Sequence, residues 1–99
     1  MVLASPVYFY SICAQLKTVI DRCVAKWTEI NNKEFYYIAS SGDEAKDAGN
    51  CTFECFRGLA KCFSSSVEKG VIFAPGMYPS GAVKNTEYAT LAYEMGKNV

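Results

Sequence analysis

Three short apolar runs alternate along the chain with three longer segments in which apolar residues recur at helical spacing. The runs span residues 2–4, 35–39 and 71–74 and are together rich in β-branched and aromatic residues, as strands usually are. The longer segments span residues 11–30, 52–63 and 86–96. Apolar residues that recur every three or four positions form one stripe on a helix. The pattern therefore predicts the order strand–helix–strand–helix–strand–helix.

The first predicted helix begins near Ser11, whose hydroxyl can cap free backbone amides. It ends near Ile30, before the turn-forming pair Asn31-Asn32. Its stripe consists of Ile12, Leu16, Val19, Ile20, Cys23, Val24 and Trp27. The last predicted helix starts from a cap at Asn85 or Thr86.

Strands that alternate with helices indicate βαβ units and a parallel sheet, and hence an α/β fold. The first run is apolar throughout, which is typical of a strand buried on both faces. The carboxyl ends of parallel strands meet at one edge of the sheet, where open α/β sheets bind ligands. The loops at that edge begin at Ser5-Pro6, Ser40-Ser41-Gly42 and Ala74-Pro75-Gly76. We therefore expect a ligand site at this edge.

The length, composition and charge of the chain limit the number of domains and the kinds of partner that it can have. The 99 residues, 51% of them hydrophobic, suit a single domain over residues 1–99. Ten basic and ten acidic residues give no net charge, which argues against nucleic-acid and anionic-membrane partners and leaves little repulsion between copies. The start does not resemble a signal peptide, and no apolar run is long enough to span a membrane. We expect a cytoplasmic protein.

The five cysteines lie in segments predicted as helical, which favours reduced thiols buried as small apolar side chains. Cys51 and Cys55 share one side of a helix, but a metal site would usually add a second pair of cysteines or histidines. The chain has no histidine. Asp43, Glu44 and Asp47 are interpreted as a solvated loop. We therefore expect no metal site.

The segment after the first strand carries the most specific motif. Ser5-Pro6-Val7-Tyr8-Phe9 is followed by Gln15-Leu16-Lys17 and by Ile20-Asp21-Arg22. This pattern resembles the loop and helix of flavodoxin-like NAD(P)H-dependent FMN reductases. Ser40-Ser41-Gly42 resembles the next flavin-facing loop of that family. On the residues alone, aromatic side chains after a strand more often pack in a core or at its rim.

The resemblance implies FMN as the cofactor and NAD(P)H as the hydride donor. It places the Pro-Val-Tyr-Phe loop against the isoalloxazine ring, with a second set of contacts from the serine-glycine loop. Because the cofactor carries the hydride chemistry, no catalytic side chain is required. The cofactor-binding residues so implied are Ser5, Pro6, Val7, Tyr8, Phe9, Ser11, Ser40, Ser41 and Gly42.

The family's sheet has five parallel strands in the order 2-1-3-4-5, and this chain resembles only strands 3, 4 and 5. The resemblance thus implies a truncated flavodoxin-like three-layer sandwich without the loop that holds the flavin phosphate. An unpaired edge on the first strand tends to pair with other chains. We therefore expect a homo-oligomer formed through that strand, or an incomplete fold of low stability.

Three functions stay open. The first is an FMN-dependent NAD(P)H oxidoreductase that reduces flavin, quinone or azo-type acceptors. The second is a flavodoxin-like electron carrier or binding module without a nicotinamide reaction of its own. The third is a non-catalytic fragment that does not bind flavin alone.

Overall fold

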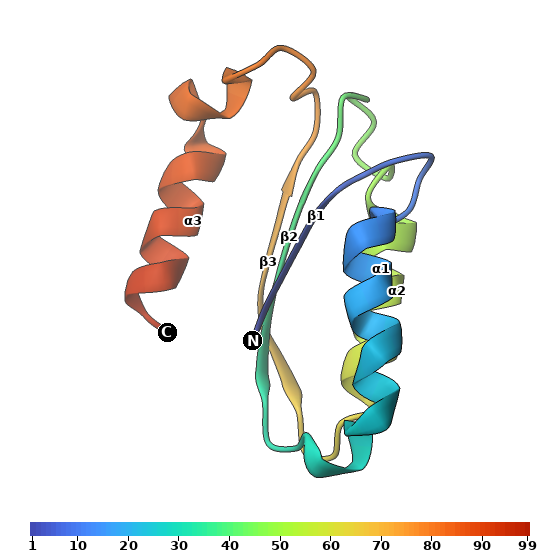
Figure 1. Cartoon of the computed structure of the whole chain (residues 1–99). Helices are drawn as coiled ribbons and strands as arrows, with labels where there is room; N and C mark the ends of the chain where they lie inside the picture. The colour runs from blue at the N-terminus through green and yellow to red at the C-terminus, as the bar shows by residue number, and fades with distance from the viewer.

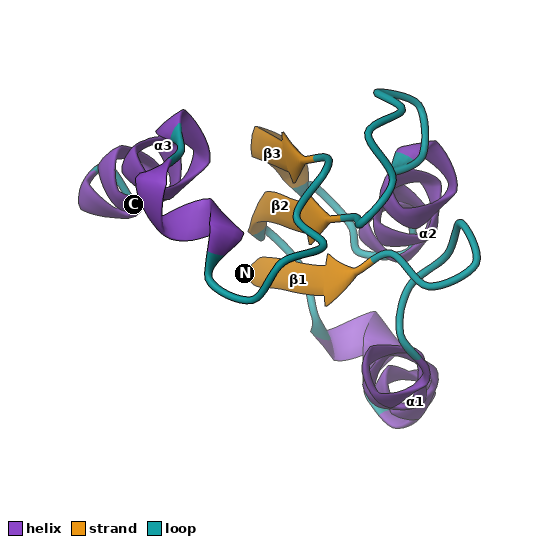
Figure 2. Cartoon of the chain, turned by 90° about the horizontal axis from the view of Figure 1, so that it is seen from above, coloured by secondary structure: helices purple, strands orange, loops and turns teal.

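One parallel sheet of three strands lies between two layers of helices, as Figure 1 shows. The computed structural model describes all 99 residues. The strands are β1 (Val2–Pro6), β2 (Glu34–Ser40) and β3 (Val67–Ala74), in the order β1-β2-β3. Helices α1 (Ala14–Arg22) and α2 (Asn50–Lys61) cover one face, and α3 (Glu87–Lys97) lies on the other (Figure 2). The predicted element order and the parallel α/β sheet are confirmed.

The first helix is shorter than predicted. It continues as two 3-10 turns, η1 (Cys23–Ala25) and η2 (Trp27–Glu29), and it is preceded by an N-cap at Cys13. Ser11 does not cap the helix, because its backbone pairs with Tyr8 in a tight turn. The cap at the start of α3 is Thr86, one of the two residues predicted.

The expectation that β1 is buried on both faces is wrong. Leu3 and Ser5 are buried, whereas Val2 is 57% exposed, so burial alternates along the strand. The reason is that α3 packs against β3 and leaves the same face of β1 uncovered (Figure 2).

The core lies between the sheet and α2. Phe35 and Tyr37 of β2 are fully buried and meet Phe56 of α2 and Phe63, with the rings of Tyr37 and Phe56 centred 5.4 Å apart. Fully burying side chains of this size stabilises the fold by roughly 1.5–3 kcal/mol each. Tyr36, between Phe35 and Tyr37, is buried too, so β2 is covered on both faces, as expected for the central strand of a parallel sheet.

The cysteines are not buried as predicted. Cys51 and Cys62 are exposed, and the other three thiols are partly exposed. Helix α2 turns Phe53, Phe56 and Leu59 toward the sheet, and this rotation leaves the thiols at the margins of the apolar stripe. The five thiols are free.

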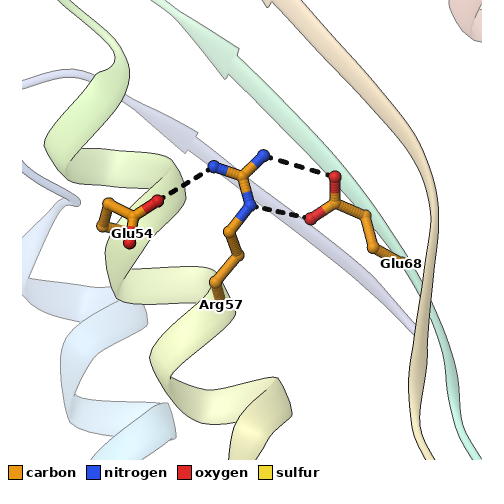
Figure 3. A network of polar contacts seen from close by, with 3 residues as sticks. All are labelled: Glu54, Arg57 and Glu68. Carbon is orange, nitrogen blue, oxygen red and sulfur yellow. Dashed lines mark hydrogen bonds and ion pairs between the residues drawn. The ribbon is translucent and has the colours of Figure 1, made fainter.

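An ion-pair network links helix α2 to strand β3 (Figure 3). The Arg57 guanidinium donates to both carboxylate oxygens of Glu68, at 2.8 and 3.2 Å, and to Glu54 at 3.0 Å. These hydrogen bonds raise the pKa of Arg57 above its ordinary value, Glu68 contributing most. Lys17 pairs with Asp21 on α1, as expected for a helix surface.

The helices are all too short or too polar to cross a membrane.

Candidate functional site

Three loops meet at the carboxyl edge of the sheet, where the sequence predicts a ligand site. The second and third loops are joined by backbone hydrogen bonds. The Met77 amide donates to the Ser41 carbonyl at 2.7 Å, and the Gly76 amide donates to the Asp43 carbonyl at 2.9 Å. The Ser41 hydroxyl also donates to the Asp43 carbonyl, at 2.7 Å. These bonds hold the loop after β2 rigidly against the loop after β3.

The loop after β1 is a tight two-residue turn. The Tyr8 and Ser11 backbones exchange hydrogen bonds of 2.9 and 3.0 Å, and Phe9 and Tyr10 form the tip. Both tip residues have positive φ, 48° and 63°. Such a turn normally uses asparagine or glycine. Two consecutive aromatic residues in this conformation are strained by about 1–3 kcal/mol each, a pattern found at functional sites.

The strained turn points aromatic side chains into solvent. Phe9 is fully exposed at 101%, and Tyr8 and Tyr10 are about 60% exposed. Burying an aromatic ring in a core is strongly favourable, and these exposed rings forgo that gain in the protein alone. A bound ligand that covers the rings would explain why they are held in solvent.

A hollow of about 180 Å³ lies between this turn and the loop after β2. Its lining contains no basic side chain, and Asp43 is its one charged residue. The Asp43 carboxylate already accepts the Ala45 amide at 2.8 Å. The lining residues are Val7, Phe9, Tyr10, Ser41, Gly42, Asp43 and Ala48.

Backbone donors around the hollow are free. The amides of Phe9, Tyr10 and Gly42 take part in no hydrogen bond within the protein. Amides near a hollow of low charge suit the carbonyl oxygens and ring nitrogens of a flat heterocycle. The arrangement can therefore bind a planar polar-edged ring and offers nothing to balance a phosphate.

The structure brings only part of the sequence-predicted set together at this hollow. Val7, Phe9, Ser41 and Gly42 line it. Ser40 instead lines a separate groove beside α3. Ser5 is buried, and its hydroxyl accepts the Cys13 amide at 2.9 Å and donates to the Pro6 carbonyl at 2.6 Å. Pro6, Tyr8 and Ser11 shape the turn beside the hollow.

Tyr10 is a site residue that the sequence reasoning missed, because it lines the hollow. Tyr78, on the loop after β3, is 89% exposed and lines the groove beside α3, but it also contacts the loop after β2. A Cβ atom placed on Gly42 would lie 3.1 Å from Cδ2 of the Tyr78 ring. The signal available in the sequence was the position of Tyr10 directly after Phe9, in the loop that follows the first strand.

Cys13 lies at the start of α1, just behind the turn. The pKa of its thiol is lowered, chiefly by a hydrogen bond from the Leu16 amide and next by the Ser5 hydroxyl. The thiol is therefore more readily ionised than an ordinary cysteine.

Comparisons with known proteins agree with this geometry. The model of a family described as NADPH-dependent FMN reductase matches residues 1–62, which carry the β1 and β2 loops. The structure of the Trp repressor binding protein from Bacillus subtilis is similar, with a TM-score of 0.76 and 21% identity. The match covers 94% of this chain and 62% of that one, and at this identity it speaks for the fold alone. No curated protein matches the chain.

Proposed function

Because the chain belongs to the NADPH-dependent FMN reductase family and has a flavodoxin-like fold, we propose that its carboxyl-edge hollow binds the isoalloxazine ring of FMN. The proposal extends to a reaction in which the bound flavin takes a hydride from NADPH and passes electrons to an acceptor. The observation that carries it is the Phe9-Tyr10 tip, where strained aromatic residues stand exposed beside free amides.

The residues present fit the ring of the cofactor. The Phe9 and Tyr10 side chains offer flat apolar surface, and aromatic pairs gain about 0.5–1.5 kcal/mol beyond their burial. The Gly42 amide, free of any partner, can donate to the polar edge of the ring. Gly42 has no side chain to hold that edge away. Walls without a basic side chain suit the ring end of FMN, not its phosphate.

FMN, when bound, supplies the hydride chemistry. The part of the protein is to bind and orient the ring. Phe9 covers one side of it, and the loop after β2 is held in place by the Met77–Ser41 and Gly76–Asp43 hydrogen bonds. We assign no acid or base to this chain. NADPH is the donor that the family's description favours.

Self-association through β1 and a cytoplasmic location remain predictions. So does the division of the chain into a single domain over residues 1–99.

The test is a fluorescence titration of FMN with the full chain, followed by NADPH oxidation in the presence of FMN. Flavin fluorescence should fall on binding, and Phe9→Ala should weaken the affinity about ten-fold, the equivalent of about 1.4 kcal/mol. Tyr93→Ala is the matched control, because Tyr93 is an exposed aromatic residue on α3 away from the hollow. It should bind FMN like the unchanged chain.

The outcomes separate the three functions left open by the sequence. Binding with NADPH oxidation supports the reductase. Binding without NADPH oxidation favours the electron carrier. Unchanged FMN fluorescence favours the non-catalytic alternative and overturns the proposal. Equal FMN affinities for Phe9→Ala and Tyr93→Ala would remove the site assignment.

A further inference from the structure

An apolar pocket of about 430 Å³ lies between the two helices that cover one face of the sheet. Val24 and Trp27, in the 3-10 turns that continue α1, line one side of it, and Leu59 and Phe63, at the end of α2, line the other. Leu59 and Phe63 are buried, whereas Val24 and Trp27 are 72% and 45% exposed. The pocket therefore has a closed apolar floor and is open to solvent.

This pocket is separate from the hollow at the carboxyl edge of the sheet. The two share no lining residue. Both helices run from the end of the sheet that carries the three loops to its opposite end, where α2 ends and the 3-10 turns after α1 lie (Figure 1). A ligand in the pocket would therefore leave the proposed flavin site uncovered.

The polar groups of the lining already have partners. The Cys23 and Cys62 thiols each donate to the backbone carbonyl four residues earlier, at 3.4 Å. The Asp21 carboxylate, the one charged group of the lining, is paired with Lys17. A polar ligand would lose hydrogen bonds to water and gain none in the pocket, which costs free energy. An anion would in addition meet the Asp21 carboxylate. The occupant that fits is therefore apolar and uncharged.

The charges around the opening argue against a protein segment as the occupant. The Lys26–Glu29 and Lys17–Asp21 ion pairs lie on the same turns and helix, and all four side chains are more than half exposed. A protein laid over the opening would strip water from these charges, a cost that ion pairs often do not recover. It would also bring backbone amides and carbonyls that need partners. A small molecule within the pocket avoids both costs.

The lining also favours a flat ring. Trp27 and Phe63 present aromatic surface, and Cys23 and Cys62 present polarizable sulfur atoms, and both kinds of group make favourable contacts with aromatic rings. The volume of the pocket lies within the range of ligand-binding cavities, about 300–1,000 Å³. A cavity of about 150 Å³ holds benzene, so this one has room for about two or three rings.

We propose that the pocket between α1, its 3-10 turns and α2 is a second ligand site, which binds a neutral aromatic compound. Trp27 covers one side of the ligand, and Leu59 and Phe63 contact it from the floor. The ligand makes no hydrogen bond to the protein. Because the pocket and the hollow share no residue, this inference stands or falls independently of the proposed flavin site.

The pocket is tested with N-phenyl-1-naphthylamine, a neutral aromatic probe whose emission rises in apolar surroundings. Trp27 is the only tryptophan of the chain, so its fluorescence reports on this pocket. As the probe is titrated into the full chain without FMN, the Trp27 emission should fall and the probe emission should rise through energy transfer. Saturation should occur at one probe molecule per chain.

Three valine variants locate the bound probe. Val24→Asp places a charge at the pocket and should weaken probe binding about ten-fold or more. Val19→Asp is the matched control, because Val19 is 60% exposed on α1 and does not line the pocket. Val83→Asp is the control for the groove beside α3, which Val83 lines. Both controls should bind the probe like the unchanged chain, and circular dichroism establishes that the variants are folded.

The thiols give a measurement on the unchanged chain, which needs no variant to fold. Bound probe should slow the alkylation of Cys23 and Cys62 by N-ethylmaleimide several-fold, as followed by peptide mapping. Cys51 is the internal control, because it is exposed on the first turn of α2 and does not line the pocket. Its rate should not change.

The proposal is overturned if the Trp27 emission is unaffected by the probe, or if Val24→Asp weakens binding no more than Val19→Asp or Val83→Asp does. Equal protection of all the thiols would also overturn it. Displacement of the probe by FMN in equilibrium dialysis would place the probe in the hollow instead. A dimer in sedimentation that Val24→Asp dissociates would show that a second copy fills the pocket.

Discussion

Gly42 and Tyr78 are in such close contact that a single added methyl group would lie 3.1 Å from the Tyr78 ring. Gly42 belongs to the loop after β2, and Tyr78 to the loop after β3. The absence of a side chain at residue 42 thus lets the third loop close against the second beside the hollow.

Gly42→Ala should lower FMN affinity several-fold. The exposed Tyr78 side chain can move to accommodate the methyl group, so the free energy of unfolding should change by less than about 1 kcal/mol. Fluorescence titration and urea unfolding measure the two effects. Gly58→Ala is the control, because nothing lies within 4 Å of a Cβ there. It should stabilise α2 by about 0.5–1 kcal/mol and leave FMN affinity unchanged. A Gly42→Ala variant with unaltered affinity would count against the site.

Phe9→Gly should stabilise the protein and weaken FMN binding together. Glycine adopts positive φ without strain, so relief of the turn should raise the free energy of unfolding by about 1 kcal/mol. Loss of the ring should lower FMN affinity. Thermal unfolding and FMN titration give the two values. Tyr93→Gly, within α3, should instead destabilise the chain by up to about 1 kcal/mol. A destabilised Phe9→Gly variant would show that the turn is not strained.

The Cys13 thiol should react with iodoacetamide at lower pH in the folded chain than in the urea-unfolded chain. Its pKa is lowered in the folded state, so the reactive thiolate forms earlier as the pH rises. Peptide mapping separates Cys13 from the other thiols. Ser5→Ala should shift the profile part of the way back, because the Ser5 hydroxyl is the second cause of the lowered pKa. Identical profiles for folded and unfolded chains would contradict this.

Tyr37→Phe should stabilise the fold by about 1 kcal/mol, because the buried Tyr37 hydroxyl has no hydrogen-bond partner. Burial, and next the Glu68 charge, raise the pKa of Tyr37. The protonated tyrosine is then favoured by folding. The stability that protonated Tyr37 adds is fully present below the ordinary tyrosine pKa of about 10. It is lost as the pH rises through the raised pKa of Tyr37 in the folded chain. Urea unfolding from neutral to alkaline pH should therefore show a decline that Tyr37→Phe reduces.

Glu68→Gln should lower the free energy of unfolding by at most about 1 kcal/mol, since the Arg57–Glu68 pair is partly exposed to solvent. The loss should shrink in high salt, because screening weakens the original pair. Asp21→Asn is the control, because the Lys17–Asp21 pair lies within one helix. Its effect should be smaller. If Glu68→Gln lowers the free energy of unfolding equally at low and high salt, the loss comes from packing and not from charge.

The sequence alone determined the order of elements, the parallel sheet and the edge at which a site could form. It did so because the spacing of apolar residues within each segment, and the order in which strand-like and helix-like segments follow one another, can be read directly from the chain. Phe35 and Tyr37 mark a strand face, and Phe53 and Phe56 mark a helix face, whatever surrounds them. Pro6, Gly42 and Gly76 mark the ends of strands for equally local reasons.

Tertiary structure decided which of the candidate residues share a site. Ser5 and Ser40 follow the same sequence logic as Ser41, yet Ser5 bonds to the Pro6 carbonyl and Ser40 faces the α3 groove. The positive φ of Phe9 and Tyr10 has no signature in an aromatic sequence, because the turn is fixed by its two ends, Tyr8 and Ser11. The exposure of β1 likewise depends on where α3 packs. The placement of Ser40 and the exposure of β1 arise from contacts between segments distant in the chain, and no local pattern encodes them.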